Sequence, residues 1–366
     1  MRVDGKSYRS IWRDGKGTVT VIDQTFLPFS FVTRPLRTVD EAAEAIAIMR
    51  VRGAPLIGAT AAYGICLAMD ADPSDEAFDA ACQKLLTTRP TAINLRWALD
   101  DMRRCLWNRP RSERAAAAYE RADAICEEDV STNEAIGRHA LGLFMRHWEE
   151  KGETDRLNVL THCNAGWLAT VDWGTALSPV FQAHQTGIPV HVWVDETRPR
   201  NQGASLTAWE LVSHGIPYTV IVDNAGGHLM QRGAVDLCIV GTDRTTAGGD
   251  VCNKIGTYLK ALAARDNGIP FYVALPGSTI DWTLENGRDI PIEERDPSEV
   301  TTLRGVGDDG ITRTFHITPE GSPSENPAFD VTPRHLVTAF VTERGVCPAS
   351  REGLTLLYPE RRSGLA

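Results

Sequence analysis

The feature that most constrains the fold is an alternation of short β-rich runs with helix-length segments after residue 152. The β-rich runs are 157–161, 190–194, 218–222, 237–240 and 271–274. Strands that alternate with helices are typical of a parallel sheet covered by helices on both faces. The sequence therefore predicts a Rossmann-like, doubly wound α/β domain over residues 151–366.

Each β-rich run is followed by a polar loop that contains glycine or proline. These loops are 162–166, 195–203, 223–227, 241–244 and 276–281. In open α/β sheets, ligands bind beyond the carboxyl ends of the strands. We therefore expect the five loops to line one crevice, which is the predicted binding site.

Residues 1–150 have a different pattern, mostly helical after a short β start. A strand is predicted at 18–22, and Thr38 with Glu41 forms a capping box before a helix that runs to about Arg50. Further helices are predicted from about residues 55, 74, 91 and 112, the last with breaks near 129–133 and an end near 151. The chain is thus expected to divide at about residue 150 into a mostly helical N-terminal domain and an α/β domain.

Two segments near the C-terminus complete the prediction. Residues 283–330 are rich in Gly, Pro, Asp, Glu and Thr. We expect them to form a long surface excursion or a partner-contacting arm. A last helix is predicted at 333–343.

The charge of the chain bears on its partners. Its 366 residues carry 38 basic and 48 acidic side chains, a formal net charge of −10, and no run of Lys or Arg. Phosphate backbones and anionic membranes are bound by clustered positive charge. We therefore expect no nucleic-acid or membrane partner, and any anionic ligand must be bound by local groups.

The N-terminus and the cysteines indicate the compartment. Residues 1–17 have no apolar core of a signal peptide, and the most apolar stretch, 54–69, is shorter than a membrane span and contains proline and glycine. The eight cysteines form no regular framework, which is typical of reduced thiols that lie mostly in the core. These observations favour a cytoplasmic protein without a membrane segment.

Familiar cofactor signatures are absent from the sequence. No Gly-x-Gly-x-x-Gly follows the first predicted strand, and 248–254 lacks the Gly-Lys-Ser/Thr of a phosphate loop. The histidines and cysteines show no metal-ligand spacing. We expect neither an organic cofactor nor a metal, so ordinary side chains must carry the chemistry.

Two residues in the predicted crevice are candidates for catalysis. Cys163 ends a strand, and the N-terminus of a following helix would lower the pKa of its thiol; the alternative is a buried core cysteine. Asp243 follows Gly241-Thr242 after another strand, where a partly apolar crevice would raise its pKa and make it a general acid. The alternative is a turn or N-cap carboxylate.

Three basic residues are candidates for binding an anion. Lys254 follows Asn253 in a glycine-containing segment and is one of only six lysines. Arg52 precedes a helix start marked by Pro55, and Arg89 precedes another, where free N–H groups attract anions. Each alone would more often be a surface residue, but together they predict a pocket for a small phosphorylated molecule.

The motifs that carry these residues resemble those of the 5-methylthioribose-1-phosphate isomerase family, in the same order from about residue 8 to 358. They are 52–58, 89–95, 161–166, 195–199, 202–203, 206–211, 223–225, 241–244 and 249–258. The resemblance implies a helical domain on a Rossmann-like domain, a homodimer, no cofactor, and isomerisation of 5-methylthio-α-ribose 1-phosphate to 5-methylthioribulose 1-phosphate in methionine salvage.

The resemblance also implies roles for individual residues. Cys163 and Asp243 would be the catalytic pair, with Asp243 as the acid and Cys163 as a base or a transition-state stabiliser. The phosphorylated sugar would be held by Arg52, Gly53, Ala54, Arg89, Gln202, Asn253 and Lys254. Hydrogen would pass from C2 to C1 through an enolate or as a hydride, and the sequence leaves both routes open.

Several site-loop residues depart from the family pattern. They are Ala165, Trp167, Asn201, Ser205, Thr242 and Gly248. They leave the catalytic pair intact but leave the C5 substituent of the substrate open, so 5-deoxyribose 1-phosphate and ribose 1,5-bisphosphate are alternatives. The site loops hold no basic residue beyond Arg198, Arg200 and Arg244, which favours an uncharged C5 group.

A non-enzymatic alternative also follows from the fold. Regulatory subunits of the guanine-nucleotide exchange factor in translation initiation share it, but they generally lack the Cys and Asp together. Since Cys163 and Asp243 are both present here, the sequence favours an enzyme.

Overall fold

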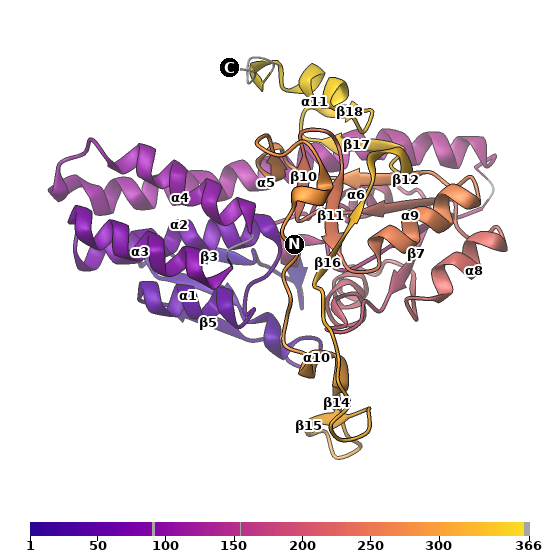
Figure 1. Cartoon of the computed structure of the whole chain (residues 1–366), viewed down its shortest axis with the longest axis horizontal. Coiled ribbons are helices and arrows are strands. Elements are labelled where there is room, and N and C mark those ends of the chain that lie inside the picture. The colour runs from indigo at the N-terminus through magenta and orange to yellow at the C-terminus, as the bar shows by residue number, and fades with distance from the viewer. Residues whose placement is uncertain (90–91, 154, 362–366) are drawn as a thin grey trace.

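The computed structural model describes residues 1–89, 92–153 and 155–361. Its N-terminal part opens with a small hairpin and an antiparallel sheet that packs on a group of helices (Figure 1). The strands are β1 Arg2–Val3, β2 Lys6–Ser7, β3 Ile11–Arg13, β4 Val19–Ile22 and β5 Thr33–Leu36. The helices are α1 Val39–Ala47, α2 Ala54–Ala71, α3 Asp75–Thr88 and α4 Ile93–Leu106.

The predicted elements of this part are confirmed with small shifts. The strand expected at 18–22 is β4, and Thr38 Oγ1 accepts a hydrogen bond from the Glu41 N–H at the start of α1. The helices expected from 55 and 74 are α2 and α3. The start expected near residue 91 lies outside the described residues, and α4 is described from Ile93.

Helix α2 is the core of this part. It is the one helix, among the described residues, long and apolar enough to cross a membrane by length and composition, and 78% of that window is buried within the protein. It packs against α1, α3, α4 and α5. It is therefore a core helix of a folded domain.

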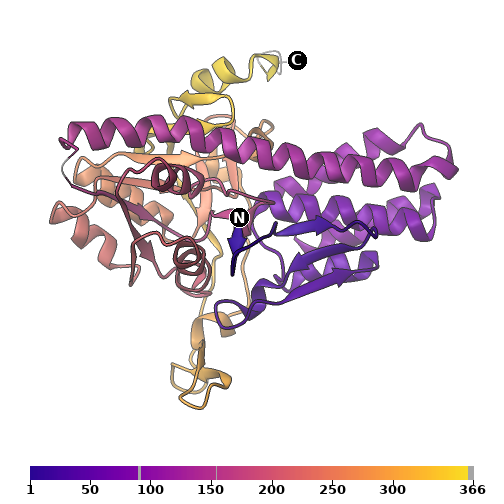
Figure 2. The same ribbon diagram turned by 180° about the vertical axis from the view of Figure 1, so that it is seen from behind.

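Helix α5, Arg111–Glu150, runs without interruption along both parts of the molecule (Figure 2). The breaks predicted near 129–133 are wrong. Polar side chains there hydrogen-bond to carbonyls of the preceding turn and so stay within the helix: Asn133 Nδ2 donates to the Asp129 carbonyl and Ser131 Oγ to that of Glu128. Helix α5 contacts α2 at one end and α6 at the other.

The second part is built on a seven-stranded sheet with the order β18-β17-β12-β9-β6-β7-β8. Its strands are β6 Leu157–Thr161, β7 Val190–Asp195, β8 Tyr218–Ile221, β9 Leu237–Val240, β12 Phe271–Ala274, β17 Ala339–Thr342 and β18 Gly345–Cys347. All neighbours pair in parallel except β17 with β18. The five predicted strands and the parallel, doubly wound class are confirmed.

Helices cover both faces of this sheet (Figures 1 and 2). They are α6 Ser178–Gln185, α7 Ala208–Ser213, α8 Ala225–Gln231, α9 Thr257–Asp266 and, near the C-terminus, α11 Arg351–Leu357. Side chains of α5 and α6 share one apolar core with β6 and β7, whereas those of α8 and α9 share another with β9 and β12.

A smaller sheet of order β13-β10-β11-β16 lies beyond β9. Its strands are β13 Ile280–Asp281, β10 Arg244–Thr246, β11 Val251–Lys254 and β16 Phe329–Thr332. Strand β11 carries Asn253 and Lys254, two of the predicted site residues.

The segment 283–330 is the predicted surface excursion. It holds α10 Ser298–Thr301 and a hairpin of β14 Thr302–Val306 and β15 Thr312–His316, which projects from the body (Figure 1). The helix predicted at 333–343 is wrong. A short turn, Arg334–Leu336, leads into strand β17, where Phe340 and Val341 are fully buried and pair with β12. Burial of β-formers against the sheet outweighs the local helical pattern.

Candidate active site

The site is built where the strand order of the large sheet reverses. The chain runs from β6 outward to β7 and β8 on one side, and from β9 outward to β12 and β17 on the other. Strands β6 and β9 pair in parallel, so the loops after them leave the same edge side by side. Cys163 lies in the first loop and Asp243 in the second, at the position where doubly wound sheets bind ligands.

Six of the nine predicted site residues line one cavity there. They are Arg52, Gly53, Ala54, Cys163, Asp243 and Asn253. The cavity volume is about 30 Å³, whereas ligand pockets commonly hold about 300–1,000 Å³. Its walls come from α2 and from the loops of the sheet, and it shares Arg52, Ala54 and Asp243 with two adjoining cavities.

The other three predicted residues lie next to this cavity. Arg89 lines a second cavity that also contains Ala54 and Asp243. Gln202 lines a third cavity, which it shares with Arg52, and its buried Oε1 has no hydrogen-bond partner among the described residues. Lys254 on β11 is buried, and its charge acts on both Cys163 and Asp243.

The backbone at Cys163 is held in a strained conformation. Cys163 has φ 67° and Thr197 also has φ 67°, a region that L-residues with side chains rarely adopt. The Cys163 N–H donates to Thr197 Oγ1 at 2.8 Å, and its carbonyl accepts from Thr207 Oγ1 at 2.8 Å. Such strain is typical of functional sites, where the surroundings fix one geometry.

The thiol of Cys163 is not activated by a helix, so that prediction is wrong. The described residues after it form a short turn, Trp167–Ala169, and no α-helix before α6. Burial raises the pKa of Cys163, while the positive charges of Arg52 and Lys254 partly oppose this. The surroundings of Cys163 therefore disfavour the thiolate form.

Asp243 has the raised pKa that was predicted for a general acid. The cause is its enclosure by protein, partly opposed by Lys254, Arg52 and Arg89. It does not cap a helix, because strand β10 begins at the next residue. Its main-chain N–H donates to the Cys252 carbonyl at 3.0 Å, which fixes the loop against β11.

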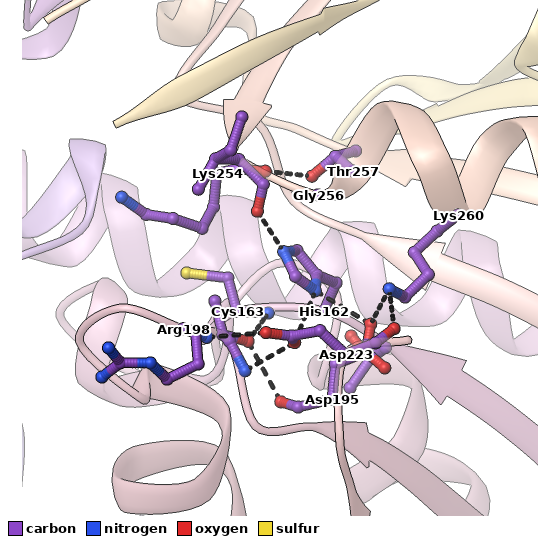
Figure 3. Close-up of polar contacts among 12 residues, drawn as sticks. His162, Cys163, Asp195, Arg198, Asp223, Lys254, Gly256, Thr257 and Lys260 are labelled. Atoms are coloured by element: carbon purple, nitrogen blue, oxygen red, sulfur yellow. Dashed lines mark hydrogen bonds and ion pairs between the residues drawn. The ribbon is translucent and has the colours of Figure 1, made fainter. Parts of the chain in front are cut away.

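Lys254 is a core residue and not the surface lysine that its residue type alone would suggest. Its Nζ donates to the Ala328 carbonyl at 2.8 Å and lies 4.8 Å from the centre of the Phe329 ring. Burial lowers its pKa. The side chains of Lys254 and Cys163 extend toward the same side of the site (Figure 3).

Helix α2 presents its N-terminus to the cavity. Gly53 precedes the first turn with φ 91°, and a Cβ there would overlap the backbone of Ala169. Pro55 lies in the first turn, as predicted. Because the first N–H groups of a helix lack partners within it, this end attracts anions.

Sequence reasoning missed a buried ionic cluster on the far side of Cys163 (Figure 3). His162 Nδ1 lies 2.9 Å from Asp195 Oδ2, and His162 Nε2 lies 2.8 Å from the Ile255 carbonyl. The Nζ of Lys260 lies 3.2 Å from the same Asp195 oxygen. Both ring nitrogens of His162 thus face oxygen atoms within hydrogen-bond distance.

The sequence placed Asp195 and Asp223 in predicted site loops, but it did not indicate their basic partner, Lys260. Asp195 and Asp223 each follow a predicted strand, whereas Lys260 lies on a helix face without a motif. Ligand atoms of His162, Asp195 and Asp223 lie within 4.8 Å of one another, as in some metal sites. Here the ammonium of Lys260 already supplies the cation beside Asp195.

The chain is similar to known proteins over nearly its whole length. The profile of the Initiation factor 2 subunit family matches residues 50–349. Methylthioribose-1-phosphate isomerase of Rhodospirillum rubrum is 63% identical over 368 residues, covering 99% of this chain and 94% of that protein. The protein of the same name from Methylorubrum populi is 63% identical over 364 residues, covering 99% of each.

The chain is also similar to solved structures over nearly its whole length. The crystal structure of 5-methylthioribose 1-phosphate isomerase from Pyrococcus horikoshii OT3 matches with a TM-score of 0.83 and 41% identity, covering 97% of each chain. The structure titled translation initiation factor eIF-2B, subunit delta, from A. fulgidus matches with a TM-score of 0.80 and 39% identity, covering 96% of this chain and 100% of that one.

Proposed function

Because the chain belongs to the methylthioribose-1-phosphate isomerases of the Initiation factor 2 subunit family, we propose that it converts 5-methylthio-α-ribose 1-phosphate into 5-methylthioribulose 1-phosphate. The observation that carries the proposal is the pairing of Cys163 with Asp243 across one cavity whose walls include a helix N-terminus and Arg52. An acid, a thiol and an anion site are the groups that this aldose–ketose isomerisation requires.

The substrate explains the need for an acid. A sugar phosphorylated on its anomeric oxygen cannot open by itself, since the anomeric hydroxyl proton is replaced by phosphate. The ring oxygen must be protonated as its bond to C1 breaks, which leaves C1 electron-poor. Asp243 is the proton donor in our proposal, because its raised pKa keeps it protonated at higher pH than an exposed aspartate.

In this proposal the phosphate is held by groups from two elements, α2 and β11. Arg52, Gly53 and Ala54 bind it from the N-terminus of α2, and Asn253 with Lys254 from β11. Gln202 and Arg89 reach the sugar itself, away from the phosphate, from the flanking cavities. These positive charges also attract the anion to a chain of net negative charge.

Hydrogen must then pass from C2 to C1 while the C2 oxygen becomes a carbonyl. In the enolate route a base removes the C2 proton and returns it to C1. In the hydride route the C2 hydrogen moves with its electron pair directly to C1, and the C2 hydroxyl gives its proton to the Asp243 carboxylate that remains after the ring oxygen has been protonated. The raised pKa of Cys163 favours the hydride route, in which the thiol stays neutral and stabilises the transition state in a site shielded from water.

The cavity beside Asp243 supports a methylthio group at C5. Its apolar walls are Ile57, Ala92, Ile290, Pro291 and Phe329. Its two arginines are already paired: Arg89 lies 3.1 Å from Glu293, and Arg244 lies 3.4 Å from Asp281. A second phosphate, as in ribose 1,5-bisphosphate, would need additional positive charge.

The second candidate function is a non-catalytic regulatory subunit. It is favoured by the match to the Initiation factor 2 subunit family and by the similarity to the subunit delta structure. The presence of both Cys163 and Asp243 in one cavity supports the enzyme instead.

We further propose that the protein is a homodimer and that it works in the cytoplasm. The cytoplasmic location is in keeping with its eight free cysteines, all within the described residues.

The route is tested with substrate that carries deuterium at C2. After turnover in ordinary water, the hydride route leaves deuterium on C1 of the ketose at every conversion. Loss of deuterium to water would contradict the hydride route and support an enolate. If no ketose forms at all, the isomerase proposal itself fails.

A further inference from the structure

Glu210 on α7 is a carboxylic acid that the proposed reaction does not use. It has 0% exposure and lies beside the active-site loop. Its Oε1 accepts hydrogen bonds from Asn164 Nδ2 at 2.8 Å and from the Leu168 N–H at 3.1 Å. Its Oε2 accepts from the Trp167 N–H at 2.9 Å. A buried carboxylate held only by neutral donors is costly, so its presence requires an explanation.

The Glu210 carboxylate packs directly against Gly166. A Cβ on Gly166 would overlap Glu210 Oε2. Gly166 therefore gives the carboxylate the room to reach the main chain of the turn at 167–168. The side chain of Glu210 and the loop that follows Cys163 are thus in direct contact.

Asn164 connects Glu210 to the anion site. Its Nδ2 donates to Glu210 and, at 3.2 Å, to Thr207 Oγ1. Its Oδ1 accepts from Arg52 Nη1, and its main-chain carbonyl accepts from Arg52 Nη2 at 2.8 Å. Because an ionised carboxylate can only accept, it forces the amide of Asn164 to turn its NH2 toward Glu210 and its oxygen toward Arg52.

We propose that Glu210 is a positioning residue for the substrate phosphate, because it orients Asn164, which in turn fixes the guanidinium of Arg52 beside the N-terminus of α2. Two of the five N–H donors of Arg52 are used by Asn164, and Arg52 itself lines the cavity that contains Cys163 and Asp243. This inference rests on the proposed function, since it is that function which gives Arg52 a phosphate to bind.

The charge state of Glu210 adds a second readout. Burial raises its pKa to about 7, and the hydrogen bonds from Asn164 and from the main chain of residues 167–168, with the positive charge of Arg52, oppose this. Protonation removes the negative charge of the carboxylate and so weakens the hydrogen bonds that it accepts, including the one from Asn164. The KM of the wild-type protein should therefore rise as the pH falls below this pKa.

The test is Glu210→Gln in the full-length protein, with kcat and KM for 5-methylthioribose 1-phosphate measured separately. We expect KM to rise about 10-fold or more, as when a group supporting a ligand-binding residue is lost, and kcat to change much less. Asp129→Asn is the matched control. Asp129 is another enclosed carboxyl with a pKa raised to about 7 that accepts a main-chain N–H, from Val171, but it lies away from Arg52.

A second variant covers the case in which Glu210→Gln does not fold. Asn164→Ala should raise KM to the same degree and abolish the acid-side rise of KM seen in the wild type. The titration of the substrate phosphate is common to both proteins and cancels in the comparison. An unchanged KM in Glu210→Gln, or the same pH dependence of KM in Asn164→Ala and the wild type, would overturn the inference. Absence of wild-type turnover would instead refute the proposed function.

Discussion

Cys163 and Asp243 follow neighbouring parallel strands, β6 and β9, at the place where the strand order of the sheet reverses. From β6 the chain continues toward one edge of the sheet, and from β9 it continues toward the other edge. The loops that follow these two strands therefore lie on either side of a crevice. The 74 residues from 167 to 240, which lie between these loops, build β7, β8, β9 and their helices. The fold itself thus brings the thiol and the carboxyl to one cavity.

The catalytic pair is tested by Cys163→Ser and Asp243→Asn. Each should lower kcat by at least about 100-fold, the lower range for loss of an acid–base group. Cys105→Ser in α4 and Asp308→Asn in the projecting hairpin are the matched controls and should leave kcat unchanged. Near-normal turnover in either site variant, with the thermal unfolding midpoint retained, would refute that residue's role.

The acid role of Asp243 predicts a pH effect with a definite sign. Activity should fall as the pH rises through its pKa, because only the protonated carboxyl can donate. The charge of Lys254 lowers this pKa, so Lys254→Met should raise it further and move the alkaline limb of kcat to higher pH. The pH profile of kcat checks this, and a limb that stays in place or moves to lower pH contradicts it.

The buried cluster beside Cys163 predicts a large loss of stability in Lys260→Met. The variant would leave Asp195, which is 0% exposed, without its ammonium partner. Breaking a buried pair in this way costs about 3–5 kcal/mol. Lys84→Met, which removes an exposed pair with Asp40, should cost no more than about 1 kcal/mol. Urea unfolding compares the two, and equal losses would show that the cluster is not the stabilising element described.

The start of α2 predicts that Gly53 cannot be replaced. Gly53→Ala would place a Cβ against the backbone of Ala169 at a positive φ. We expect lower stability and a KM raised about 10-fold or more, since small shifts of a binding group have large effects on rate. Gly227→Ala within α8, where a Cβ would meet only ordinary contacts, should be neutral or stabilising by about 0.5–1 kcal/mol. Equal effects of the two substitutions would contradict this account.

Much of the architecture could be predicted because local patterns and tertiary structure agree. Strands β6, β9 and β12 begin and end at the predicted residues, since β-rich runs bounded by loops are buried on both faces of a parallel sheet. The local pattern misled at 333–343, where a helix was predicted and strand β17 is found. There the pairing of β17 with β12, between segments more than sixty residues apart in the sequence, decides the structure.

The site could be predicted as a set of loops but not as a network. Cys163 and Asp243 were found because each follows a strand. The links from Arg52 to Asn164 and on to Glu210 join three separate segments, and no spacing in the sequence reveals them. The predicted lowering of the Cys163 pKa was wrong, because burial by distant segments raises this pKa and no helix follows the residue directly.

The central claim is tested most directly by phosphorus and proton NMR of the protein with 5-methylthioribose 1-phosphate, with 5-deoxyribose 1-phosphate and with ribose 1,5-bisphosphate. The account predicts conversion of the first to its ketose with the phosphate retained, and a preference for it over the bisphosphate because the cavity beside Asp243 has apolar walls and paired arginines. A folded protein that converts none of the three, or that prefers the bisphosphate, would contradict it.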